Sequence, residues 1–214
     1  MAVTVTIAGN RTLGDLKARI ADELARPDLA SQIALAIEDA ITEAATYRFW
    51  FNEVNGVQFP LLAGQALYGN PDLDAMTEID EIWFRPNGQR QSLRLVSDTV
   101  LDGYAQGTAT VGQPYLYSRR GNGLRIYPTP DQGYTLHVDG STRFPPMLDD
   151  LDWNGWTTSG ERFIRALAKR QLLADVIRDP EEAQVQDALA IRYREELLSA
   201  TYDRVASGQM VCNG

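Results

Sequence analysis

Three aspartates lie close together in the segment Asp149-Asp150-Leu151-Asp152, and their side chains are typical of acid-base or metal chemistry. Paired carboxylates act as acid and base in glycoside hydrolysis, and they also bind calcium. An EF-type calcium loop needs acids or amides at alternate positions, a central glycine and a terminal glutamate, and this segment lacks that pattern. A solvated connector is the simpler interpretation. A hydrolase that uses Asp149, Asp150 and Asp152 stays open as an alternative.

Nucleophilic catalysis needs a nucleophile, a base within reach and usually a group that orients the base. The single histidine, His137, lies between Leu136 and Val138 in an alternating segment, which is typical of a structural histidine. The single cysteine, Cys212, lies close to the C-terminus of the sequence. One histidine and one cysteine exclude metal sites built from several such residues, and they exclude an internal disulfide. The sequence therefore predicts no enzyme, no metal and no cofactor.

Aromatic and basic residues provide two candidates for binding. Tyr115, Tyr117 and Tyr127 fall in predicted strands, and alternation along these strands would place them on one face. Burial of these rings in the core is the simpler interpretation, and a small-ligand or glycan-binding β module is the alternative hypothesis. Arg119 and Arg120 lie at a predicted hairpin tip, where a solvated turn is the simpler interpretation and contact with a phosphate or an acidic protein surface is the alternative.

The charge of the chain argues against two classes of partner. The 214 residues carry a formal net charge of −9, from 20 Lys and Arg against 29 Asp and Glu. Neutralising phosphates needs a positive surface, so the composition disfavours a protein that coats nucleic acid or an anionic membrane. No segment approaches the roughly 18 consecutive apolar residues of a membrane span, and residues 1–7 lack a signal-peptide pattern. We expect a globular protein of a reducing cytosol.

A helical hairpin is predicted near the N-terminus. Thr12 and Asp15 form a capping box that begins a helix, and Pro27 ends it. A second helix is expected to begin at residues 28–31, with a stripe of isoleucines flanked by alanines. Small residues beside the stripe would let another backbone approach closely.

A pair of helices is predicted near the C-terminus. Thr158 and Glu161 form a second capping box, which would begin the first of the two. Asp179-Pro180 would begin the last helix, with aspartate as the N-cap and proline at the first helical position. Gly208 is expected to end it.

In the middle of the sequence, apolar and polar residues alternate, as is typical of β-strands. Three turn sequences predict hairpins, namely Asn55-Gly56, Asn87-Gly88 and Gly121-Asn122-Gly123. A further strand is predicted over residues 134–138, and a short helix over 97–104.

These elements predict an α+β fold in which an N-terminal helical hairpin and a C-terminal helix pair pack together, with a central antiparallel β region inserted between them. The expected boundaries are a helical bundle of residues 1–50 and 157–206, a β domain of residues 51–156 and a C-terminal tail of residues 207–214.

The last helix carries apolar residues on two opposite sides. One side would pack on the protein's own core. The other apolar side must also be covered. Either it is buried within the same subunit, or a second subunit or a partner protein covers it. The candidate interface residues come from this second side, from the segment near the C-terminus and from the hairpin tip. They are Ile191, Leu198, Tyr202, Val205, Met210, Arg119 and Arg120.

Short motifs follow the helical hairpin in a distinctive order. They are Gly112-x-Pro114-x-x-Tyr117, Pro128-x-Pro130, the acidic loop with Trp156, and the closing helix pair. From about Leu13 to Val205, this order resembles the adaptor, or head-to-tail connector, proteins of tailed bacteriophages and related gene transfer agents. One departure is Tyr68-Gly69-Asn70-Pro71, where such proteins often have a more apolar Tyr-x-Leu-Pro.

The resemblance implies a structural virion protein, assembled in the host bacterial cytoplasm, with no catalytic residues. It implies a ring of twelve copies under the portal vertex. The helical part would contact the portal protein, with the C-terminal segment along or inside it, and the β part would receive the next tail or neck protein. Double-stranded DNA would pass through the lumen without specific binding, which the net charge of −9 favours at short range.

Overall fold

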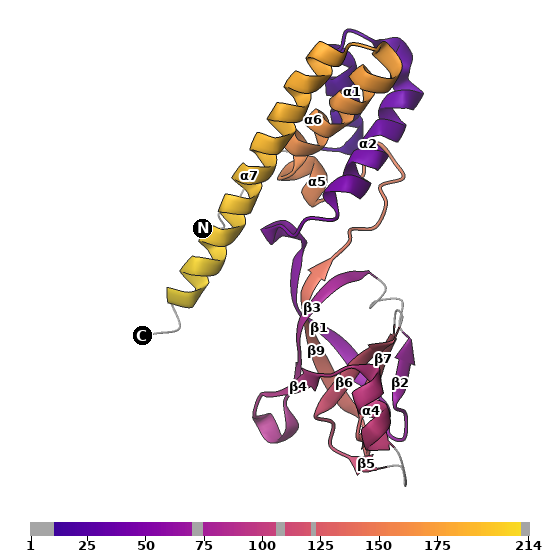
Figure 1. Cartoon of the computed structure of the whole chain (residues 1–214), viewed down its shortest axis with the longest axis vertical. Helices are drawn as coiled ribbons and strands as arrows, with labels where there is room; N and C mark the ends of the chain where they lie inside the picture. Colours follow the sequence, from indigo (N-terminus) through magenta and orange to yellow (C-terminus); the bar gives the residue numbers. More distant parts are fainter. Residues whose placement is uncertain (1–10, 70–74, 106–109, 121–122, 211–214) are drawn as a thin grey trace, which may run out of the picture. The chain divides into compact units, whose positions relative to one another are not determined.

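The computed structural model describes residues 11–69, 75–105, 110–120 and 123–210, and for residues 105, 120 and 205–210 it describes the backbone alone. The chain divides into two compact units, Met1–Asn52 with Phe144–Gly214 and Glu53–Arg143. The first unit is helical and the second is built on a largely antiparallel sheet, so the predicted α+β fold is confirmed (Figure 1).

The N-terminal helical hairpin has the predicted start. Helix α1 spans Leu13–Glu23, and a 3-10 turn at Pro27–Leu29 leads into α2, Ala30–Ala44. The Asp15 N–H donates to the Thr12 hydroxyl at 3.2 Å, and the Thr12 N–H donates to the Asp15 carboxylate at 3.0 Å. This reciprocal pair satisfies two donors that a helix N-terminus leaves free, and it confirms the predicted capping box.

The C-terminal helices begin differently from the prediction. A short helix α5, Gly155–Thr158, precedes α6, Glu161–Gln171. The capping box predicted at Thr158 and Glu161 is wrong, because Thr158 lies at the end of α5 and its hydroxyl donates to a backbone oxygen. The box belongs instead to α5, where Asn154 and Thr157 exchange the capping hydrogen bonds.

Glu161 is occupied by another interaction. Its side chain is only 2% exposed. The carboxylate forms ion pairs with the guanidinium nitrogens of Arg11 at 2.6 Å, Arg19 at 3.2 Å and Arg165 at 3.0 Å. A buried carboxylate is stable only when it is paired, and three guanidinium groups provide that pairing. Glu161 therefore joins α6 to α1 and to the residue that precedes the α1 cap.

Helix α7 spans Pro180–Met210 and follows a π-helical turn, Leu172–Ile177. Asp179 caps α7 as predicted, because its carboxylate accepts the Glu182 N–H at 3.1 Å. Gly208 does not end the helix, which continues to Met210. A single glycine costs a helix only about 1 kcal/mol, and this cost does not force termination.

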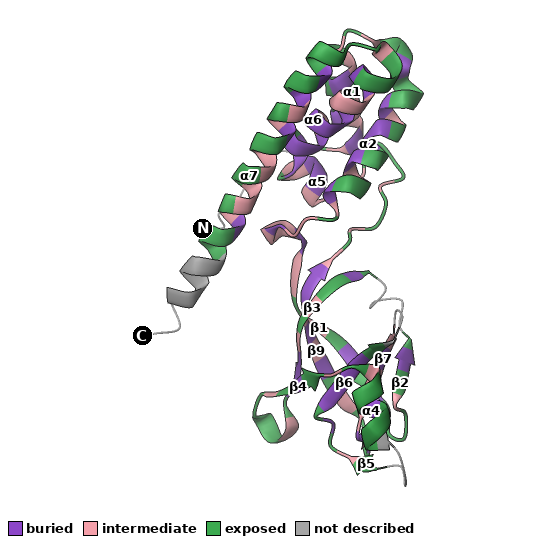
Figure 2. Cartoon of the chain, in the orientation of Figure 1, coloured by how far each residue is buried: buried purple, intermediate pink, exposed green. Residues whose placement is uncertain are grey.

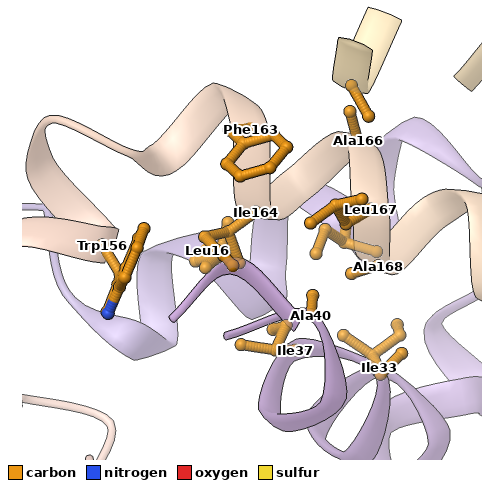
Figure 3. Packing of buried hydrophobic residues seen from close by; sticks show 14 of the residues in the cluster. Leu16, Ile33, Ile37, Ala40, Trp156, Phe163, Ile164, Ala166, Leu167 and Ala168 are labelled. Carbon is orange, nitrogen blue, oxygen red and sulfur yellow. The ribbon is translucent and has the colours of Figure 1, made fainter. Parts of the chain in front are cut away.

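The core of the helical unit lies where α1, α2 and α6 meet (Figure 3). Leu16, Ile33 and Ile37 pack against Ile164 and Leu167 of α6, and all are buried. One end of this core is aromatic. The ring of Phe49 meets the rings of Trp156 and Phe163 edge to face, with centroids 5.9 and 6.1 Å apart, a favourable arrangement for aromatic pairs.

The second unit contains a seven-stranded sheet of order β1-β9-β3-β4-β6-β7-β2 and a small sheet of β5 and β8. The strands are β1 Glu53–Leu61, β2 Leu67–Gly69, β3 Met76–Phe84, β4 Gln91–Leu95, β5 Val111–Gly112, β6 Leu116–Arg120, β7 Gly123–Tyr127, β8 Thr129–Pro130 and β9 Tyr134–Thr142. Short helices of this unit occur at Pro86–Gly88 and at α4, Asp98–Ala105, and another short helix, Trp50–Asn52, ends the N-terminal segment of the first unit. The pairs β4–β6 and β5–β8 are parallel, and the other pairs are antiparallel.

The hairpin predicted at Asn55-Gly56 is wrong. Strand β1 continues through these residues and pairs with β9 on both sides of them. Gly56 has φ of 68°, and the register shifts between Val54 and Val57, so the two residues form a bulge. The Gly56 N–H donates to the Asp139 carboxylate at 2.6 Å. A residue pair that tolerates positive φ serves a bulge as well as a turn, and the sequence does not distinguish these two uses.

The other β predictions are confirmed. Strands β3 and β4 form a hairpin around Asn87, which has φ of 56° as its turn requires. Strands β6 and β7 form the next hairpin, and the tip residues 121–122 lie outside the described residues. The expected strand at 134–138 and the expected helix at 97–104 correspond to β9 and α4.

Candidate interaction surface

Helix α7 lies along α6 and uses one side for this contact (Figure 2). Ala183, Gln186, Ala190 and Thr201 are buried on that side. One ion pair and one hydrogen bond hold α7 against the rest of the helical unit: Arg170 of α6 donates to Asp187 at 3.1 Å, and Arg194 donates to the Tyr47 hydroxyl at 3.1 Å. Ala183, Gln186 and Ala190 are three to four residues apart, and Thr201 follows three helical turns later, so the four residues lie on one helix face.

The other side of α7 holds part of the predicted interface. Ile191 is 43% exposed and Tyr202 is 69% exposed. Leu198 is half-buried and packs against the helical core, so it contributes to both sides. Val205 and Met210 belong to α7, but their side chains lie outside the described part of the chain.

The predicted arginines lie at the end of β6, in the other unit. Arg119 is exposed, and Arg120 is described only as part of the strand. Arg119 pairs with Leu124 in the hairpin register, and Arg120 pairs with Gly123. Both residues therefore flank the hairpin tip, as the sequence predicts.

The three tyrosines predicted for one face do not lie together. Tyr117 is 3% exposed and pairs with Ile126 in the sheet core, and this burial raises the pKa of its phenol. Tyr127 pairs with Leu116 instead, on the opposite face. Tyr115 and Tyr127 do contact each other, with ring centroids 6.0 Å apart. Residues that pair across two strands share a face of the sheet, and neighbours along one strand lie on opposite faces. Because Tyr127 pairs with Leu116, the neighbour of Tyr117, Tyr117 and Tyr127 lie on opposite faces and the prediction is wrong.

The acidic loop uses its carboxylates for structure. Asp152 accepts the backbone N–H groups of Asp149 and Leu148 at 2.9 and 2.8 Å, which lowers the pKa of Asp152 below its ordinary value. Asp150 pairs with Lys17 at 2.7 Å. The acid of a glycosidase needs a raised pKa, so Asp152 is unsuited to that role. Leu148, Leu151 and Trp153 of this loop are exposed, although apolar side chains are more often buried.

His137 has the structural role that its sequence context predicts. Its ring stacks on Trp83 with a centroid distance of 4.2 Å, and the Trp83 N–H donates to Asp139 at 2.9 Å. The described residues contain no group of three or more His, Cys, Asp or Glu side chains suited to a metal ion. Cys212 lies outside the described residues. Within the described ranges, no helix is long and apolar enough to span a membrane.

The two short motifs of the sequence lie side by side. Gly112 pairs with Pro130 and Val111 pairs with Thr129 in the small sheet. The backbone N–H of Tyr115 donates to the backbone carbonyl oxygen of Tyr127 at 3.0 Å. Their order along the chain thus reflects a contact between them. A family model described as SU10 adaptor protein matches residues 11–211. The chain belongs to this adaptor family. No curated protein matches the chain.

Membership in the SU10 adaptor family places the protein among bacteriophage structural proteins and makes it a virion component that interacts with other head or tail proteins. The family consists of structural adaptors and is not known for enzymes.

Proposed function

We propose that this chain is the head-to-tail adaptor of a tailed bacteriophage. Twelve copies would form a ring that joins the portal to the tail and continues the DNA channel. The helical unit would contact the portal, and the β unit would contact the next tail or neck protein. The match to the adaptor family over residues 11–211 carries this proposal.

The form of α7 supports an interface between copies or with the portal. This helix of 31 residues is about 46 Å long. The buried residues described on it end at Thr201, while Tyr202 is exposed beyond that point. Ile191 and Tyr202 are separated by three helical turns on one side. Exposed apolar residues on one side of a long helix are typical of a surface that another helix or subunit covers.

The charge distribution supports a channel wall that DNA slides past. The helical unit carries 13 Lys and Arg against 19 Asp and Glu, and the β unit carries 7 against 10. Both units are therefore acidic. Like charge repels DNA phosphates within a Debye length of about 8–10 Å, so we expect no specific DNA binding.

Particles made without the protein test the proposal. We expect capsids that package DNA and then leak it or fail to acquire tails, and we expect normal particles when the wild-type chain is supplied in trans. Tailed infectious particles made in its absence would refute the proposal.

A variant of α7 tests the interface. Ile191→Ser with Tyr202→Ser should keep the fold and lose ring assembly, measured by mass photometry of the purified chain mixed with portal rings. Val185→Ser is the matched control, because Val185 is exposed on the same helix but points about 100–120° away from Ile191 and Tyr202 around the helix axis. Rings that form equally with both variants would exclude this surface.

A further inference from the structure

We propose that copies of this chain bind one another through two different faces of the helical unit, which carry opposite charge. The basic face consists of Arg11, Arg19, Arg162, Arg165 and Lys169. The acidic face consists of Leu35, Asp39 and Glu43 of α2 and of Asp187, Ile191, Glu195 and Tyr202 of α7. The basic face of one copy would bind the acidic face of the next. This inference rests on the proposed function, because it states how the subunits of the proposed ring hold together.

The basic face has more cations than its own carboxylates neutralise. Three of its guanidinium groups share the single carboxylate of Glu161. Glu23 pairs with Arg165 at 3.1 Å and with Lys169 at 2.8 Å. Two carboxylates thus pair with four cations. Arg162 adds a fifth cation, because it is exposed and forms no ion pair among the described residues. The two arginines outside α6 are 51% and 44% exposed, so this excess of positive charge reaches the surface.

The acidic face lies on another side of α6, where α2 and α7 flank this helix (Figure 1). Arg170 marks that side, because its guanidinium pairs with Glu43 at 2.6 Å and with Asp187 at 3.1 Å. Arg165 and Arg170 are five residues apart, which places them about 140° apart around the helix axis. Each copy therefore presents the two faces in different directions.

Helix α2 contributes one half of the acidic face. Leu35, Asp39 and Glu43 follow one another at spacings of four residues, so they share one side of α2. Asp39 accepts a hydrogen bond from Gln171 of α6 at 2.8 Å. One turn before Asp39, Leu35 is 62% exposed, so an apolar side chain lies next to the two carboxylates.

Helix α7 contributes the other half. Asp187, Ile191 and Glu195 are also spaced by four residues, and Tyr202 lies two turns after Glu195 on the same side. Ile191 and Tyr202 are exposed. Glu195 is exposed as well, and its side chain forms no ion pair among the residues that the structure describes. The acidic face therefore combines apolar side chains with carboxylates.

The charges of the helices are complementary. Helices α1 and α6 with Arg11 carry seven Lys and Arg against four Asp and Glu, whereas α2 and α7 carry three against nine. Opposite potentials at an interface favour association and fix its orientation. The net charge of −9 is thus compatible with self-association, because each contact joins a basic surface to an acidic one.

A contact between two different faces also suits a ring. An interface that uses the same patch on both partners ends at a dimer, whereas a contact between different patches continues from copy to copy and closes into a ring when the rotation allows. The occupant of each face is therefore a second copy of this chain.

Two charge-reversal variants of the full-length chain test this arrangement. Arg162→Glu changes the basic face and Glu195→Arg changes the acidic face, and both residues are exposed. Each variant alone should self-associate at least about tenfold more weakly than wild type, measured by mass photometry with and without purified portal rings. An equal mixture of the two should form pairs with wild-type affinity and few larger species, because one unaltered contact is left. Such pairs would also show that both variants are folded.

Matched controls carry the same charge changes elsewhere on the helical unit. Arg178→Glu lies in the turn before α7, and Asp203→Arg lies on α7 about 80° around the axis from Glu195. Both residues are exposed, and both variants should associate as wild type does. Self-association of the wild-type chain should weaken as salt is raised, since screening reduces the attraction between opposite charges.

Four results would overturn the inference and leave the proposed function standing. They are wild-type association of both charge-reversal variants, association that strengthens with salt, dimers of Arg162→Glu alone, which would indicate a contact between identical patches, and intact self-association with loss of portal binding, which would make the portal the occupant. A wild-type chain that fails to associate both alone and on portal rings would instead refute the proposed ring, and this inference with it.

Discussion

The backbone N–H of Trp50 donates a hydrogen bond to the hydroxyl of Thr201, at 3.1 Å. Thr201 is the last buried residue described on α7, and its hydroxyl also donates to the Leu197 oxygen at 2.8 Å. The guanidinium of Arg204 lies 3.7 Å from the centre of the Trp50 ring, one turn further along. This group of contacts fastens α7 to the segment that follows α2.

Replacement of Thr201 by valine should loosen this end of α7. Valine keeps the shape of the side chain and removes the acceptor, so the Trp50 N–H loses its partner at a cost of about 1–3 kcal/mol. We expect faster amide exchange at residues 198–204 and a lower free energy of unfolding in urea. Thr201→Ser retains the hydroxyl and should exchange nearly as slowly as wild type. Equal protection in Thr201→Val and wild type would contradict the structural role of this bond.

Position 140 in β9 should tolerate only glycine, because the β3 backbone lies too close for a side chain. A Cβ atom there would lie 2.1 Å from the Glu78 backbone oxygen, and neither strand can move without breaking the β3–β9 ladder. Gly140→Ala should therefore lower the free energy of unfolding by about 1–3 kcal/mol or more.

Gly103→Ala is the matched control, because no atom lies within 4 Å of the new Cβ and the residue lies within α4. Alanine favours helix by up to about 1 kcal/mol, so this variant should unfold at an equal or higher temperature. Similar melting temperatures for the two variants would show that the close approach at Gly140 is relieved at little cost.

Acid should weaken the loop that contains Asp152. Hydrogen bonds from the backbone N–H groups of Asp149 and Leu148 lower the folded-state pKa of Asp152 below its ordinary value of about 3.9. A lowered pKa contributes stability that is present above the ordinary value and lost as the pH falls through the folded value. Carbon-detected NMR titration should show the Asp152 carboxyl titrating below pH 4. Asp152→Asn should abolish the titration, and a midpoint at or above 4 in the wild-type protein would contradict the hydrogen-bonded geometry.

Local sequence signals predicted the elements that depend on local interactions. The Thr12–Asp15 box and the Asp179 cap involve residues three apart, and the turn at Asn87 depends on two adjacent residues. Such interactions form within one stretch of chain, so residue type and spacing are enough to identify them.

Several of the errors concern residues whose partners lie far away in the sequence. Glu161 has the spacing of a capping residue, yet its carboxylate is taken by Arg11 and Arg19 of another segment. Asn55-Gly56 has the composition of a turn, yet pairing with β9 makes it a bulge. The acidic residues around Leu151 suggested chemistry or a solvated connector, and only the contact with Gly14 shows that the loop is fixed.

The fold class, the order of the elements and the resemblance to phage adaptors can be predicted from residue order, because hydrophobic periodicity, caps and motif order are properties of the linear chain. Which side chains face solvent depends on the tertiary structure. Exposure of Ile191, Tyr202 and Leu148 depends on which segments cover them, and burial is a property of packing between segments that are distant in the chain.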